Sequence, residues 1–126
     1  MEIRKTKSKT ALLVPFSSQQ YETLEKLHQK QAKSIRVIVS SYDDEEIYLD
    51  PVDLQWSDDG EFDVLYSYAA ALAAKLTAKY VHLYDYRLEV IFYLAEKPFA
   101  LEYELDARIS KVTKKKKITI KPPKND

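Results

Sequence analysis

The sequence predicts an α+β domain in which a largely antiparallel sheet, flat or strongly curled, packs against two helices. Residues 68–84 carry apolar side chains at three- and four-residue spacing, which is typical of a helix with one buried face. From residue 86 the spacing changes to two, as in strands with one buried and one solvated face. Together these patterns predict about 6–8 strands and two helices, at about 18–32 and 68–83.

The first third of the chain predicts a strand, a helix and a second strand. Residues 10–16 form a short apolar run containing Pro15, which indicates a strand that leaves the sheet at an edge. The helix is expected to begin at Ser17 or Ser18, because either hydroxyl can accept a hydrogen bond from the backbone of the first turn. Residues 34–42 are rich in β-branched side chains and predict a buried strand.

The remaining segments predict further hairpins. Two apolar runs flank residues 57–60, and Gly60 can supply the positive φ of a hairpin turn. Residues 86–109 predict a long antiparallel hairpin, and residues 118–120 predict a last short strand. We expect one domain over residues 1–121 and a frayed tail over residues 122–126.

Glycine and cysteine usage exclude several chemistries. The chain contains one glycine and no cysteine. A P-loop, a dinucleotide fingerprint and the nucleophile elbow of hydrolases each need several glycines, because backbone must approach a ligand closely or adopt positive φ. Thiol nucleophiles and cysteine-bound metals need cysteine. We therefore expect a protein that is not an enzyme and that has no cofactor and no metal.

Charge is balanced over the chain but segregated along it. The 20 basic and 20 acidic residues cancel, yet residues 1–40 carry +5, residues 41–66 carry −10 and residues 67–126 carry +5. The apolar run near the N-terminus is too short for a signal peptide or a membrane span, so we expect a cytoplasmic protein without membrane contact. Segregated charge also permits a homo-oligomer.

The acidic stretch over residues 42–66 is the leading candidate for a functional site. Aromatic anchors within a charged rim are typical of protein-binding patches, so we expect an inhibitor, immunity factor or adaptor whose acidic, aromatic face binds a basic protein, such as a nucleic-acid-binding enzyme. Solvated turns and the wet side of a hairpin would give the same pattern. The predicted partner-binding residues are Asp43, Asp44, Glu45, Tyr48, Asp53, Trp56, Asp58 and Asp59.

The lysine-rich ends support an alternative function, a nucleic-acid-binding accessory protein. Lysine ammonium groups can neutralise phosphates, and the many tyrosines could stack on bases. Lysines beside a terminal strand are also a common guard against aggregation, so the pattern has a structural explanation as well. The candidate residues are Lys5, Lys7, Lys9, Lys114, Lys115, Lys116 and Lys117.

Overall fold

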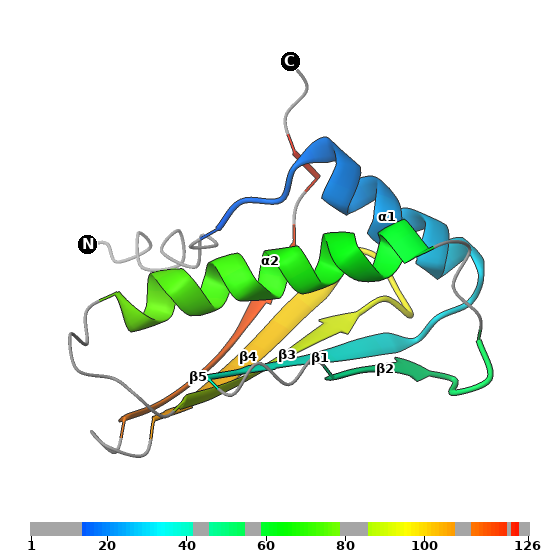
Figure 1. Cartoon of the computed structure of the whole chain (residues 1–126). Helices are drawn as coiled ribbons and strands as arrows, with labels where there is room; N and C mark the ends of the chain where they lie inside the picture. The colour runs from blue at the N-terminus through cyan, green and yellow to red at the C-terminus, as the bar shows by residue number, and fades with distance from the viewer. Residues whose placement is uncertain are drawn as a thin grey trace, which may run out of the picture.

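A computed structural model describes residues 14–41, 46–54, 59–78, 86–107, 112–120 and 122–123, with side chains at all of these except 59, 107 and 112–115. The elements are helices α1 (Ser18–Gln29) and α2 (Asp59–Thr77) and strands β1 (Ser34–Ser40), β2 (Glu46–Asp50), β3 (Tyr86–Tyr93), β4 (Ala100–Ala107) and β5 (Val112–Thr119). All neighbouring strands are antiparallel, in the order β2-β1-β3-β4-β5. Both helices lie on the same face of this open sheet (Figure 1). The predicted α+β class with an antiparallel sheet is confirmed.

Helix α1 begins where the sequence offers a complete cap. Ser17 is the N-cap residue, and its hydroxyl accepts a hydrogen bond from the Gln20 backbone N–H at 3.1 Å. The Gln20 side chain in turn accepts one from the Ser17 backbone N–H at 2.9 Å. This reciprocal pair satisfies two of the N–H groups that a helix start leaves without partners. The prediction of a cap at Ser17 or Ser18 is therefore confirmed at Ser17.

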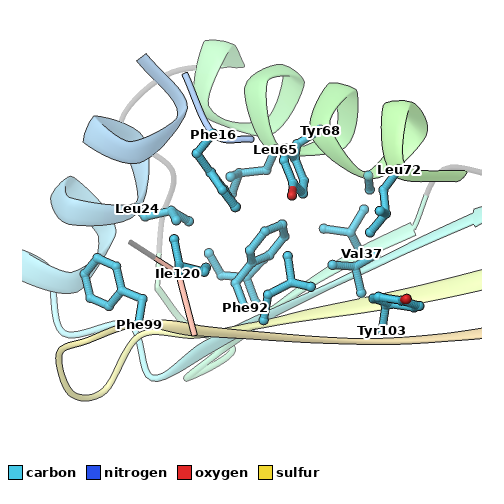
Figure 2. Close-up of a cluster of buried hydrophobic side chains, with 14 of the residues drawn as sticks. Phe16, Leu24, Val37, Leu65, Tyr68, Leu72, Phe92, Phe99, Tyr103 and Ile120 are labelled. Carbon is cyan, nitrogen blue, oxygen red and sulfur yellow. The ribbon is translucent and has the colours of Figure 1, made fainter. Parts of the chain in front are cut away.

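The core lies between the two helices and one face of the sheet (Figure 2). Phe16, which precedes α1, stacks on Tyr68 of α2 with ring centroids 4.1 Å apart, and both rings contact Phe92 of β3 edge to face. The Tyr68 hydroxyl donates a hydrogen bond to the Val14 carbonyl oxygen at 2.5 Å. Burial raises the pKa of Tyr68. The segment before α1 is thus attached to α2 and β3.

The predicted hairpin around Gly60 is wrong, because residues 59–67 form the first half of α2. In that hairpin Leu65 would lie opposite the apolar face, whereas in the structure Leu65 is fully buried. The buried positions Glu61, Leu65, Tyr68 and Leu72 follow the three- and four-residue spacing of one helix face. The helical period therefore begins about seven residues before the predicted start at 68.

Four smaller differences concern strands and element ends. Residues 14–16 are not a strand, because Pro15 lacks an N–H for the ladder and Phe16 inserts into the core; residues 10–13 lie outside the described part. The described residues contain five strands, fewer than the six to eight expected. Helix α1 ends at residue 29 rather than 32, and α2 ends at residue 77, while residues 79–83 of the predicted helix lie outside the described part. The last strand is longer than predicted, because β5 includes the lysine run before residue 118.

Candidate interaction face

The sheet has a second face on which neither helix lies (Figure 1), and we call it the outer face. Because side chains alternate along a strand, it carries the residues between the core positions of each strand. Strand register places these residues in adjacent rows. The described side chains of the outer face are Glu46, Tyr48, Asp50, Ser34, Arg36, Ile38, Ser40, Arg87, Glu89, Ile91, Tyr93, Ala100, Glu102, Glu104, Asp106, Lys117 and Thr119.

The described side chains of the outer face are predominantly acidic. Its described side chains include six carboxylates and three cations, namely Arg36, Arg87 and Lys117. The carboxylates extend from β2 at one edge through β3 to β4. At the centre, Glu89 lies directly opposite Glu104, a like-charge pairing that is unfavourable in isolation. The surface potential of this face is therefore expected to favour cations.

Two arginines surround Glu89 and offset part of this repulsion. The Arg36 Nε lies 3.1 Å from Glu89 Oε2, and the Arg87 Nη1 lies 3.9 Å from Glu89 Oε1. About half of each arginine side chain is exposed. Because the pairs are solvated, each contributes little to stability, and both place positive charge beside Glu89.

The β2 groove is an open hollow of about 440 Å³ between β2 and β1, and Tyr48 forms part of its wall. The Arg36 guanidinium lies over the Tyr48 ring, 5.7 Å from its centroid. The Tyr48 hydroxyl donates a hydrogen bond to Glu46 Oε1 at 2.9 Å, and this bond raises the pKa of Tyr48. Two contacts therefore fix a tyrosine whose surface is half exposed. Val52, 89% exposed, lines the same groove.

A second tyrosine, on the central strand β3, is held in a similar way by side chains of β4 and β5. The Tyr93 hydroxyl donates a 2.6 Å hydrogen bond to Glu102 Oε1, and this bond, with partial burial and the charge of Glu102, raises the pKa of Tyr93 to about 12. Lys117 Nζ lies 4.6 Å from the centroid of the Tyr93 ring. A small hollow of about 60 Å³ lies beside this cluster, between Glu89, Glu102 and Glu104.

The structure divides the predicted acidic site between two layers. Tyr48 and Asp53 are exposed, on β2 and in the turn that follows it, whereas Asp59 is the first residue of α2. Further along α2, Glu61 is only 5% exposed, so this carboxylate belongs to the interior and lines neither the β2 groove nor the hollow between Glu89, Glu102 and Glu104. The remaining predicted residues lie outside the described part of the chain: Asp43, Asp44, Glu45, Trp56 and Asp58.

The predicted lysine site is divided as well. Lys114, Lys115, Lys116 and Lys117 lie in β5, where consecutive positions belong to opposite faces. Register sets Lys117 opposite Glu102 on the outer face, whereas Lys116 is opposite Tyr103, a core residue. These lysines therefore do not form one continuous patch. Lys5, Lys7 and Lys9 lie outside the described residues.

Sequence reasoning did not assign a site to Arg36, Arg87, Glu89, Glu102 and Glu104. The period-two pattern of residues 86–106 already indicated that four of them share a solvated face. What was missing was the strand order, which places β1 and β2 beside β3 and so joins these residues to Tyr48. A polar face of one hairpin thus becomes part of a five-stranded surface.

The His28 ring contacts a backbone carbonyl and an aromatic ring. His28 Nδ1 lies 2.6 Å from the Leu94 carbonyl oxygen, a bond that requires the proton on Nδ1, and its ring contacts Phe99 edge to face.

The described part of the chain contains no group of three or more histidines and carboxylates that could hold a metal ion. None of its helices is long and apolar enough to cross a membrane.

Comparisons of the chain with models of known protein families, with curated proteins and with solved structures gave no match. A functional assignment therefore depends on the chemistry of the surface.

Proposed function

We propose that this protein is a non-enzymatic protein-interaction domain, of the kind used as an inhibitor, immunity factor or adaptor, and that its outer face binds a basic protein. One observation carries the proposal. The two exposed large hydrophobic residues of the described chain, Tyr48 and Val52, line the same groove on a face whose described side chains include twice as many carboxylates as cations.

The contacts of Tyr48 support a role as a binding anchor. A tyrosine held by Arg36 and Glu46 loses little conformational freedom when a partner covers it, so more of the contact energy remains for binding. Aromatic anchors surrounded by charged residues are a common arrangement in protein interfaces.

The carboxylates support a basic partner. Glu89, Glu102 and Glu104 border one hollow, and among the described side chains Arg36 and Arg87 form ion pairs with Glu89 alone of the three. A lysine or arginine from a partner would supply the missing positive charge. Such pairs increase association rates and selectivity more than affinity.

The test begins with the capture of partners from a lysate by the immobilised full chain, their identification, and purification of the best candidate. Its dissociation constant is then measured against wild type and against Tyr48→Ser/Val52→Ser. Ala71→Ser/Ala74→Ser is the matched control, because both alanines are exposed on α2, on the other layer. We expect about a tenfold or greater loss of affinity for the first variant only.

A second pair of variants tests the charge. Glu102→Gln/Glu104→Gln should slow association at low salt, whereas Glu22→Gln/Asp63→Asn on the helices should not. If the helix-layer variants weakened binding as much as the outer-face variants, or if the partner bound equally well at all salt concentrations, this proposal would be refuted.

The alternative, nucleic-acid binding through lysines, is favoured by the exposure of Lys116 and Lys117 on an edge strand. It predicts oligonucleotide binding that weakens steeply as salt rises, because each phosphate contact releases a counterion. Fluorescent single- and double-stranded oligonucleotides, tested at low and physiological salt, separate the two functions. Salt-sensitive binding that Lys117→Glu abolishes would support this alternative.

A further inference from the structure

Strand β5 is the last strand of the sheet, and no described residue pairs with its second edge. The direction of its backbone groups follows from one hydrogen bond. The Ile120 N–H donates to the Phe99 carbonyl oxygen at 2.7 Å. These two residues are the next pair when the β4–β5 register is continued by one residue. In an antiparallel ladder, alternate residues bond to the same neighbour, so Ile118 and Lys116 also point toward β4. The backbone N–H and C=O groups of Lys117 and Thr119 therefore point toward the second edge.

The inner edge of β5 shows which kind of strand this sequence pairs with. Strand β4 places Glu102 opposite Lys117 and Glu104 opposite Lys115. Lys115 and Lys117 each lie opposite a glutamate of β4. Their own backbone N–H and C=O groups point the other way, toward the second edge. A strand added at the second edge would place its residues directly opposite these lysines, at the short range typical of cross-strand pairs.

From this geometry we propose that the second edge of β5 binds an extended acidic segment of a partner protein by strand addition. Backbone hydrogen bonds at Lys117 and Thr119 would provide affinity, and carboxylates at every second residue of the segment would pair with the lysines of the outer face. The eight residues of β5 provide an edge about 27 Å long. This inference does not depend on the proposed function, because the β5 edge includes none of the residues that line the β2 groove or the hollow between the glutamates.

Lysine on an edge strand usually prevents unwanted pairing, and here that property gives selectivity. A second β5 would bring lysine against lysine, and an apolar strand would leave Lys117 beside uncharged groups. An acidic strand avoids both penalties. Nucleic acid fits this edge less well, because consecutive lysines alternate between faces and Glu102 reduces the local positive charge on the outer face.

The experiment uses a fluorescein-labelled octapeptide of alternating glutamate and threonine, with the full-length protein titrated to about 1 mM. A second peptide carries N-methyl groups on two glutamate backbone nitrogens, which keeps the charge but removes donors that an antiparallel added strand would direct at Lys117 and Thr119. Lys117→Glu tests the edge, and Lys26→Glu, an exposed lysine on α1, is the matched control. Fluorescence anisotropy gives the affinities, and amide hydrogen exchange reports protection at Lys117 and Thr119.

We expect the alternating peptide to bind at least tenfold more tightly than the N-methylated peptide, to lose at least tenfold in affinity with Lys117→Glu, and to change less than twofold with Lys26→Glu. Protection of the Lys117 and Thr119 amides should accompany binding. Equal affinity for both peptides would overturn strand addition. So would an absence of binding, tighter competing binding of an oligonucleotide, or self-association through this edge in sedimentation velocity.

Discussion

Replacing Tyr68 with phenylalanine tests how the segment before α1 is attached to the core. The side chain is fully buried, and its hydroxyl donates to the Val14 carbonyl oxygen at 2.5 Å. Removing the hydroxyl should reduce the free energy of unfolding by about 1 kcal/mol, since a typical intramolecular hydrogen bond contributes about 0.5–1.5 kcal/mol net. Tyr68→Ala also removes the ring that stacks on Phe16, so it should cost about 3–5 kcal/mol.

Urea denaturation followed by circular dichroism measures both changes. A loss of about 1 kcal/mol corresponds to a fall of about 0.3–1 M in the urea midpoint. Tyr48→Phe is the matched control, because its hydroxyl bonds to Glu46 at the surface, and its midpoint should not change. If Tyr68→Phe unfolded at the wild-type midpoint, the Val14 bond would contribute nothing and the reasoning would be refuted. In that case amide exchange near Phe16 should also remain unchanged.

Three further predictions concern the helices and the outer face. Ser17→Ala removes the cap of α1 and should cost about 1 kcal/mol in urea denaturation, whereas Ser18→Ala should cost less. Leu65→Ala should cost about 2–5 kcal/mol and Val64→Ala several times less, and the opposite order would contradict the position of α2. Because the folded pKa of Tyr93, about 12, exceeds the unfolded value of 10, its contribution to stability should be complete below pH 10 and lost as pH rises from 10 to 12. Tyr93→Phe should therefore show a shallower stability loss over this range, and an identical loss would contradict the Glu102 hydrogen bond.

Features that depend on local sequence were predictable. The cap at Ser17 needs only a hydroxyl and the glutamine three residues later, and β3 and β4 need only alternation of apolar and polar residues. Residues 61–67 were ambiguous, because Phe62 and Val64 alternate as in a strand while Leu65 continues the helix period into Tyr68. In the helical form, Leu65 and Tyr68 both pack in the core. No local sequence pattern could reveal this packing.

Features that depend on pairing were not predictable. Lysine has a low strand propensity, so the run before residue 118 resembled a loop. It is a strand in register with Glu102 and Glu104, which supply opposite charges across the pair. The candidate face has the same origin, since Tyr48 and Glu89 are far apart in sequence and share a surface only because β1 lies between β2 and β3.

The pairing of β1 with β3 has a consequence for the folding pathway. It joins Val37 to Val90, 53 positions away, whereas β1–β2 and β3–β4–β5 pair across short connections. Closing a loop of this length costs about 1.5 kcal/mol more than closing one of ten residues. The two local units can therefore form early, with their docking along β1 and β3 as the slow step. Folding rate should then respond most strongly to substitutions at Val37 and Val90.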